Sequence, residues 1–180
     1  MKKIISFSIL IVLVGVWGFS LQSEGQPVRP PRNSPSYVVA QLYSVYMNRN
    51  FRLALDFTMG REKKRVQDIL GAMNRNFGRP PQDIALFLAK IHEMRIIDEK
   101  VVDDKYAQVD VIWVLRIRDK DNSQQFQVKV NEVAYLLEKQ KNSWMIRDTK
   151  FIKQHVLYDY AAVQEKYKKS LPFSPKEESR

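Results

Sequence analysis

Residues 105–119 read KYAQVDVIWVLRIRD, and apolar side chains alternate with polar ones along most of their length. An alternation with a period of two is typical of a β-strand that buries one face. The apolar positions on that face are Ala107, Val109, Val111, Trp113, Leu115 and Ile117. The opposite face is apolar only in its middle, at Ile112 and Val114. We therefore expect a long strand in a sheet that is covered mainly on one side.

Further segments on both sides of this strand are expected to build an antiparallel sheet. Residues 94–102 precede it and residues 126–137 follow it, with turns at residues 103–104 and 119–123. Within the later segment the apolar positions change from even to odd numbers at residues 131–132. A change of phase by one residue is what a β-bulge produces, so a bulge and a strongly curved sheet are expected there.

Residues 142–151 read NSWMIRDTKF and admit two interpretations. A tryptophan close to an arginine and an aspartate suggests a reactive site, whereas a regular alternation of side chains suggests a strand. Trp144 and Ile146 alternate with Met145 and Arg147, directly after the polar turn KQKN. The alternation favours a fourth strand, and the sheet is expected to be a four-stranded meander.

Helical patterns lie mainly before the sheet. Ser34 followed by Pro35 is typical of a helix N-cap and first helical position, and apolar residues then recur every three or four positions. Helical segments are expected at residues 35–47, 51–57, 61–77, 84–91 and 158–169. The order predicts an α+β fold, with N-terminal helices packed on the concave face of a strongly curved four-stranded antiparallel sheet.

The first twenty residues have the pattern of an export signal. Lys2 and Lys3 precede an uncharged apolar run at residues 4–19, and small residues follow it up to Ser20. The run is shorter than the roughly 20 residues that a spanning helix needs. We expect a signal peptide at residues 1–20 and a periplasmic or cell-envelope location. The alternative is an uncleaved anchor in the inner membrane.

The remaining chain divides into three parts by composition. Residues 21–34 are rich in proline and are expected to form an extended tether. Residues 35–169 are expected to form the α+β domain, and residues 170–180 have the composition of a flexible tail.

The chain is basic and lacks cysteine, with a formal net charge of +10. The absence of cysteine excludes disulfides, thiolate catalysis and zinc–cysteine sites. Arg61, Lys63, Lys64 and Arg65 form the basic cluster of the chain. This cluster is a candidate contact for an anionic surface, such as acidic lipid head groups or an acidic protein face, and solubility is the alternative explanation of the charge.

Three stretches together resemble the nuclear-transport-factor-two-like superfamily, the cone-shaped, cystatin-like α+β fold. They are the proline-capped helix SPSYVVAQLYSVYMNRNF, the turn FRLALDF and the strand NSWMIRD, and the resemblance, closest to small exported bacterial members, spans residues 35–152. It implies an apolar pocket between the first helix and the concave sheet. The superfamily includes isomerases, dehydratases, lipid carriers, assembly domains of secretion systems and non-catalytic binders, so the fold alone selects no function. The helical stretch at residues 80–91 departs from the family pattern.

Aromatic and apolar residues supply the candidates for the lining of this pocket. The candidates are Tyr43, Tyr46, Phe57, Phe87, Trp113, Leu115, Tyr135 and Trp144. Rings at these spacings also suit an ordinary core. A cone mouth, however, leaves some of them half exposed, where an apolar ligand displaces water.

No catalytic or metal-binding residues are assigned from the sequence. His92 and His155 are expected at the ends of strands, and none of Asp56, Asp110 and Asp148 alternates with the apolar set. Acid–base catalysis in a cone needs such groups inside it. No metal-ligand spacing and no phosphate-binding glycine loop occurs in the chain, so no cofactor is expected. Nucleic acid ranks low as a partner.

The leading expectation is therefore a non-catalytic exported domain that binds an apolar small molecule or lipid, or an envelope protein, through its pocket. The second is a membrane-anchored assembly domain of a secretion or envelope complex, in which Ile112 and Val114 pair with a partner. A lipid shuttle comes third, and an enzyme of isomerase or dehydratase type comes last. The sequence leaves a homodimer open.

Overall fold

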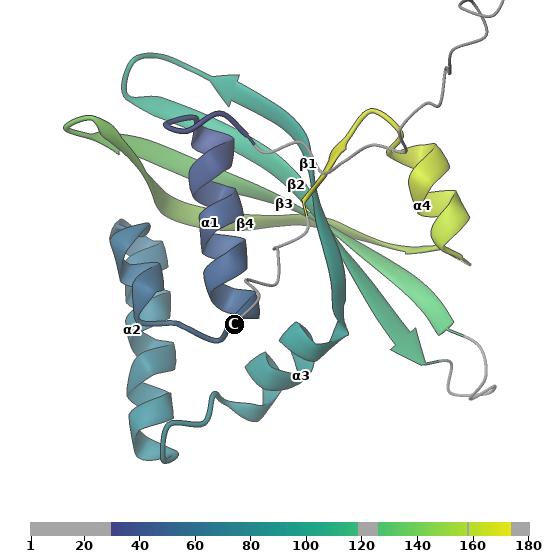
Figure 1. Cartoon of the computed structure of the whole chain (residues 1–180), viewed down its shortest axis with the longest axis horizontal. Helices are drawn as coiled ribbons and strands as arrows, with labels where there is room; N and C mark the ends of the chain where they lie inside the picture. The colour runs from purple at the N-terminus through teal and green to yellow at the C-terminus, as the bar shows by residue number, and fades with distance from the viewer. Residues whose placement is uncertain (1–29, 119–125, 158, 174–180) are drawn as a thin grey trace, which may run out of the picture.

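The computed structural model describes residues 30–118, 126–157 and 159–173 (Figure 1). The predicted export segment, most of the tether and the predicted turn at residues 119–123 lie outside these ranges. In chain order the elements are α1 (Pro35–Met47), the 3₁₀ turn η1 (Leu53–Asp56), α2 (Gly60–Arg75), α3 (Gln82–Lys90), β1 (Ile91–Val101), β2 (Tyr106–Arg118), β3 (Phe126–Gln140), β4 (Ser143–Leu157), α4 (Tyr160–Lys166) and β5 (Leu171–Phe173).

The sheet is antiparallel throughout, with the strand order β4-β3-β2-β1-β5. The predicted four-stranded meander is confirmed. The predicted tail at residues 170–180 is wrong at its start, because Leu171–Phe173 pairs with β1 and Ser170 is buried. A strand of three residues is too short to show a period, so composition alone suggested a tail.

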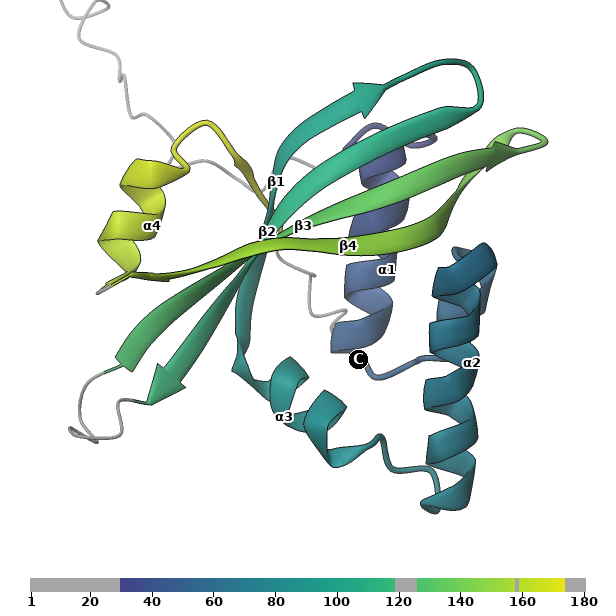
Figure 2. The same ribbon diagram turned by 180° about the vertical axis from the view of Figure 1, so that it is seen from behind.

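Helices cover both faces of the sheet. Figures 1 and 2 show α1, α2 and α3 together on one side of the curved sheet and α4 alone on the other. The α+β fold with N-terminal helices on the concave face is therefore confirmed. The strands are long and twist strongly, so that the two ends of the sheet are covered by different helices (Figure 2).

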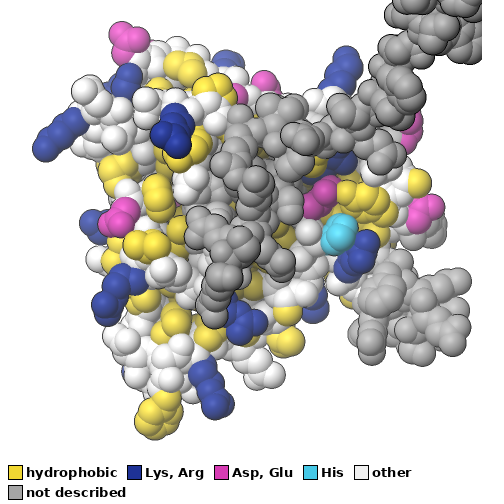
Figure 3. Space-filling model, in the orientation of Figure 1, with side chains coloured by type: hydrophobic (Ala, Val, Ile, Leu, Met, Phe, Trp, Pro, Cys, Tyr) yellow, Lys and Arg dark blue, Asp and Glu magenta, His cyan; other side chains and the backbone are white. Residues whose placement is uncertain are grey.

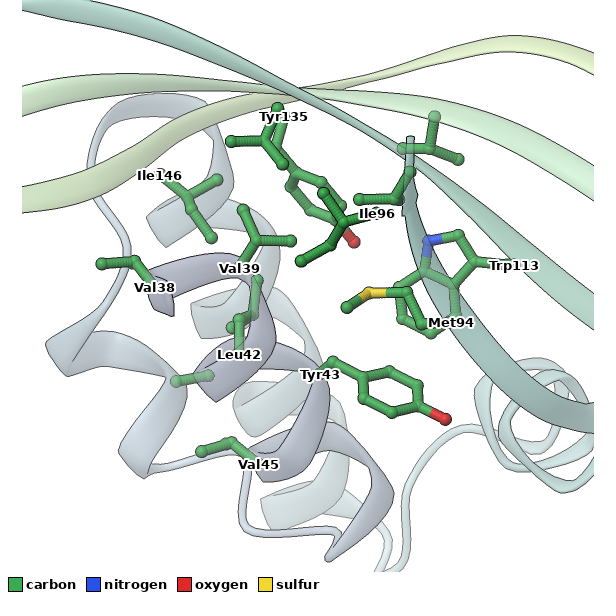
Figure 4. Packing of buried hydrophobic residues seen from close by; sticks show 14 of the residues in the cluster. Val38, Val39, Leu42, Tyr43, Val45, Met94, Ile96, Trp113, Tyr135 and Ile146 are labelled. Atoms are coloured by element: carbon green, nitrogen blue, oxygen red, sulfur yellow. The ribbon is translucent and has the colours of Figure 1, made fainter. Parts of the chain in front are cut away.

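The first helix begins as its sequence predicts. The Ser34 hydroxyl accepts a hydrogen bond from the Tyr37 backbone N–H at 3.1 Å, and Pro35 occupies the first helical position. The inner face of α1 packs on the sheet through Val39, Leu42 and Tyr43 (Figure 4). These contacts, rather than helix propensity, hold a helix of this length.

The change of phase in β3 has a different cause from the one predicted. Strand β3 pairs with β2 in one unbroken register from Arg118↔Phe126 to Tyr106↔Glu138, so β3 contains no bulge against it. The extra residues lie in the flanking strands, at His92 and Ile97 of β1 and at Arg147 and Ile152 of β4. The bulge at Ile152 lies opposite the predicted position, in the neighbouring strand.

The phase changes because the buried face changes along the strand. Val133, Tyr135 and Leu137 belong to the core under α1, whereas Val128 and Val130 belong to a second core on the opposite face. That second core includes Ile112 and Val114 of β2 together with Val163 of α4 and Tyr167, the residue that follows α4. A strand that changes its buried face shows the same shift of pattern as a bulged one.

The apolar patch predicted for a partner is therefore covered by the chain itself. Ile112 and Val114 are fully buried, and α4 provides the cover. Ile112 and Val114 therefore do not offer the partner-binding surface that the hypothesis of an assembly domain assigned to them. A helix within the predicted residues 158–169 is confirmed as the shorter α4, Tyr160–Lys166, which Asp159 caps by accepting a hydrogen bond from the Ala162 N–H at 2.8 Å.

Within the described ranges, every helix is too short or too polar to cross a bilayer.

Candidate ligand-binding cavity

A cavity of about 320 Å³ opens between the concave face of the sheet and the helices α1, α2 and α3. Its apolar lining comes from Phe51, Ile69, Ile84, Phe87, Leu88, Trp113, Val133 and Phe151. Its polar lining comes from Tyr46, Glu62, Arg65, Asn131, Tyr135 and Thr149. The cavity is thus largely apolar, with a small number of polar groups, as is typical of small-molecule sites.

Half of the residues predicted for the pocket lie in its wall. Tyr46, Phe87, Trp113 and Tyr135 line the cavity, from α1, α3, β2 and β3 respectively. The ring centroids of Phe87 and Trp113 are 6.0 Å apart, so α3 closes one side of the cavity over β2. The helix that departs from the family pattern therefore forms part of the site.

The other four predicted residues lie outside the lining. Tyr43 is buried and packs its ring against the edge of Trp113, with 5.2 Å between centroids (Figure 4). Leu115 is buried and pairs with Ile91 of β1. Trp144 is buried near the start of β4, and Phe57 packs against the core. The alternation along a strand identifies the side chains that point inward, but it does not show which of them border the cavity.

Glu62 is a functional candidate that sequence reasoning missed. It lies in the first turn of α2, within the basic cluster, yet only 5% of it is exposed. Its Oε1 accepts a hydrogen bond from the Tyr46 hydroxyl at 3.4 Å, and its Oε2 lies 2.9 Å from Nη1 of Arg65. The signal was helical spacing, because Glu62 precedes the fully buried Val66 by four residues and shares its face.

The basic cluster is divided between the cavity wall and solvent. Nη1 of Arg65 also donates to the Thr149 carbonyl at 3.1 Å, and its Nη2 lies 3.6 Å from Asp148. Arg61 approaches Asp148 at 3.4 Å. Lys63 and Lys64 are exposed and form no ion pair among the described residues. Figure 3 shows Lys and Arg side chains scattered over one face of the molecule rather than gathered on it.

The expectation that Asp148 does not alternate with the buried positions of its strand is wrong. It is buried two positions beyond Ile146, with its carboxylate held by the two arginines of α2. Trp144, Ile146 and Asp148 are buried at every second position, so Asp148 continues the alternation of β4, although the register against β3 shifts between Ile146 and Asp148. Asp148 ties α2 to β4 and does not line the cavity.

The tyrosine hydroxyls of the cavity remain protonated. Burial, together with the neighbouring Glu62 carboxylate, raises the pKa of Tyr46 far above its usual range. Burial likewise raises the pKa of Tyr135, and the nearby Tyr46 and Glu62 add to that rise. Both groups therefore present neutral O–H donors at physiological pH.

The histidines lie away from the cavity. His92 is the first bulge residue of β1, and burial followed by the charge of Arg116 lowers its pKa. His155 was expected after the last strand, but it lies within β4, with its Nε2 3.0 Å from Glu132. Across residues 30–118, 126–157 and 159–173, no three His, Asp or Glu side chains gather as metal ligands.

Comparisons with known proteins find similarity in structure but none to a protein-family model or to a curated protein. A SEC-C motif-containing protein from Rhodopseudomonas palustris is similar in structure, with a TM-score of 0.46, 10% identity, and coverage of 67% of this chain and 80% of that one. The intermembrane space region of the chloroplast protein ARC6 has a TM-score of 0.42, 12% identity, and coverage of 68% and 98%. The resemblance to the nuclear-transport-factor-two-like superfamily stays a prediction.

Proposed function

We propose that this protein is a non-catalytic binding domain that takes a small apolar molecule into the cavity between the sheet and α1–α3. The observation that carries the proposal is the composition of the lining. Eight of the fourteen lining residues are apolar, counting Trp113, and hydrogen bonds connect four of the six polar ones, namely Tyr46, Glu62, Arg65 and Thr149. An apolar body binds such a wall by displacing water, and the few polar groups orient it.

The size of the cavity limits the ligand. A volume of about 320 Å³ is near the lower end of the roughly 300–1,000 Å³ range of ligand pockets. It is about ten times the ~30 Å³ that one water molecule occupies in the liquid. A molecule of on the order of ten non-hydrogen atoms therefore suits the cavity. A single short chain or one small ring system fits these limits better than a two-chain lipid, which weakens the lipid-shuttle alternative.

The state of Glu62 supports binding over catalysis. An isomerase or dehydratase in this cavity would use Glu62 as its base, because Glu62 is the one carboxylate among the described residues that line the cavity. Oε2 of Glu62 already forms an ion pair with Arg65 at 2.9 Å, and Oε1 accepts a hydrogen bond from the Tyr46 hydroxyl. A carboxylate held in this way suits the fixed role of a hydrogen-bond acceptor.

The proposed location is the periplasm or cell envelope, and it rests on the apolar N-terminal segment alone. Binding of a small apolar molecule suits an exported protein, because such molecules cross an aqueous compartment poorly without a carrier. The expected signal peptide contains Lys2 and Lys3, so the chain after it has 28 basic and 20 acidic residues, and its net charge of +8 suits movement near anionic surfaces.

A cavity-filling variant tests the proposal. The full chain is purified natively, and the bound molecule is extracted into organic solvent and measured by mass spectrometry. Ile84→Trp places a larger side chain at a lining position and is expected to abolish binding of the molecule. Val101→Trp, at an exposed position on the far hairpin, is the matched control and retains it.

Equal amounts of extracted molecule from both variants would show that the molecule binds elsewhere. Absence of any extracted molecule from the original chain, together with no uptake of added apolar probes, would overturn the proposal.

A second candidate is docking onto an envelope protein, and one observation favours it. Strand β4 lies at the edge of the sheet, and Phe151, Ile152 and Val156 are exposed on it. An edge strand with exposed apolar side chains is a common site of strand addition. A photo-crosslinking residue at Ile152 tests this candidate in cells. A single defined partner is expected there, and none at Val102, which is exposed on the β1–β2 hairpin.

A further inference from the structure

The lining of the cavity is rich in aromatic side chains. Aromatic residues make up 11% of the chain, yet they supply six of the fourteen described residues that line the cavity. The other hydrophobic types make up about a third of the chain and supply four. The enrichment is thus specific to rings and does not extend to apolar side chains in general. The six aromatic residues are Tyr46, Phe51, Phe87, Trp113, Tyr135 and Phe151.

Three of these rings belong to the sheet side of the cavity and surround Val133 of β3. Phe151 of β4 is the register partner of Val133. Tyr135 lies two positions further along β3, and Trp113 lies two positions beyond Val111, the register partner of Val133 on β2. Side chains two positions apart on a strand share a face of the sheet, so the three rings border one apolar area. Figure 4 shows Trp113 and Tyr135 on the side of the sheet that faces α1.

The other three rings come from the helical side of the cavity. Tyr46 of α1 and Phe51, which follows α1, form one pair, with 5.6 Å between ring centroids and 38° between ring planes. Phe87 of α3 pairs with Trp113 across the two layers, with 6.0 Å between centroids and 46° between planes. All four rings of these tilted pairs belong to the lining. A ligand in the cavity therefore meets rings from both layers.

Two of the rings remain in contact with solvent. Phe87 is 39% exposed and Phe151 is 61% exposed, although both line the cavity. An exposed side chain that lines a cavity stands at its opening, so a ligand reaches these two rings directly. Trp113 is 5% exposed and lies deeper. Covering ring surface that water still contacts contributes to the affinity for a ligand.

The charges in the lining favour an uncharged ligand. Glu62 and Arg65 are the charged residues among the described ones that line the cavity, and Oε2 of Glu62 lies 2.9 Å from Nη1 of Arg65. Aromatic rings attract cations through their faces, but a cation in this cavity meets the guanidinium as well as the carboxylate. An anion likewise meets both groups. The wall therefore offers ring surface without a net charge.

We infer that the ligand of this cavity is a small, uncharged, planar aromatic molecule. Ring–ring contacts contribute beyond the area that they bury, and a rigid molecule loses little conformational freedom on binding. A saturated molecule of the same size gains only from the buried area. The cavity volume of about 320 Å³ suits one ring or two fused rings. This inference rests on the proposed function and adds the chemical class of the ligand.

Three probes of similar size test the inference. They are 2-naphthol, its saturated counterpart 2-decalol and the aromatic cation trimethylphenylammonium, and calorimetry measures their binding to the full chain. We expect 2-naphthol to bind about three- to tenfold more tightly than 2-decalol, because only 2-naphthol makes ring–ring contacts. The cation is expected to bind more weakly than 2-naphthol, because the burial of its charge is not compensated. Ring-current shifts of the Ile84 and Val133 methyl signals in NMR spectra locate bound 2-naphthol in the cavity.

Two variants remove a ring and keep an apolar side chain. Phe87→Leu and Phe151→Leu are each expected to weaken 2-naphthol binding about two- to fivefold and to leave 2-decalol binding unchanged. Phe77→Leu is the matched control and should affect neither probe, because Phe77 is 98% exposed and lies outside the lining. Thermal melts show whether each variant is folded, and 2-decalol serves as an internal measure of an intact cavity.

The outcomes separate this inference from the proposed function. Equal binding of 2-naphthol and 2-decalol overturns the aromatic inference and leaves an apolar pocket. Tightest binding of the cation also overturns it, because the site then selects a charge. A preference for 2-naphthol that both variants retain in full would place the bound ring elsewhere and overturns it as well. Binding of none of the probes contradicts the proposed function itself.

Discussion

Trp113 joins the core and the cavity in one residue. Trp113 is 5% exposed, its ring centroid lies 5.2 Å from that of Tyr43 and 6.0 Å from that of Phe87, and it forms part of the cavity wall. The two roles have different energetic signatures, because core contacts contribute to stability whereas the cavity surface contributes to ligand affinity. The stability lost on truncating Trp113 therefore measures how well the helices pack on the sheet.

Trp113→Ala is expected to lower the free energy of unfolding by roughly 3–5 kcal/mol, the usual range for a large buried aromatic. Denaturant titration followed by circular dichroism measures it. Leu86→Ala, at a position that is half exposed on α3, is the control and is expected to change stability by no more than about 0.5 kcal/mol. A loss below about 1 kcal/mol at Trp113 would contradict its burial.

At the scale of elements, α4 is held to the convex face by a polar cluster as well as by its apolar side. Glu132 of β3 accepts hydrogen bonds from the Tyr167 hydroxyl at 2.8 Å and from His155 at 3.0 Å, and Lys153 lies 3.4 Å away. Burial tends to raise the pKa of Glu132, but these hydrogen bonds and the lysine charge outweigh it and lower the pKa. The ionised form is therefore the one that holds α4.

Glu132→Gln is expected to destabilise the protein at pH 7 and to have little effect at low pH. Because the folded-state pKa of Glu132 is lowered, its contribution is present above the unfolded value of about 4.3. The contribution is lost as the pH falls through the still lower folded value. Unfolding free energies of both proteins at pH 7 and pH 3 measure the difference.

Glu165→Gln, on the exposed side of α4, is the matched control, and a similar small effect is expected at both pH values. A constant difference between the original chain and Glu132→Gln across the pH range would mean that the charge of Glu132 has no part in holding α4.

At the scale of the whole molecule, the formal net charge is +10, and the Lys and Arg side chains on the face that Figure 3 shows are scattered over it. Exposed charges act over a Debye length of roughly 8 Å in physiological salt, so binding to an anionic surface needs a local cluster. Arg61 and Arg65 are exposed but form ion pairs with Asp148, whereas Lys63 and Lys64 form no ion pair among the described residues and are therefore the members of the basic cluster most available to an anionic surface.

The double variant Lys63→Glu with Lys64→Glu is expected to reduce binding to vesicles that contain acidic lipids, with an unchanged fold. Flotation of protein with vesicles measures bound fractions, and circular dichroism monitors the fold. Lys90→Glu with Lys100→Glu changes the net charge by the same amount at two separate exposed positions and should reduce binding less. Equal reductions would assign the attraction to net charge alone.

The four long strands, the helices and their order could be predicted from local patterns, whereas the short strand β5 could not. A period of two over residues 105–119 and a period of three to four after Ser34 each report which side of a segment is buried. That information is carried by neighbours along the chain, so it needs no knowledge of the partner element. The same patterns placed Tyr46, Phe87, Trp113 and Tyr135 on inner faces, where they line the cavity.

Only the tertiary structure decided where the interior is hollow, which face α4 covers and which polar groups meet. The shift of pattern in β3 was interpreted as a bulge because the sequence shows burial without showing what causes it. Glu62 and Thr149 are brought together by Arg65 across segments far apart in the chain. Periodicity reports burial within one element, whereas a cavity depends on how side chains of several elements fail to fill the space between them.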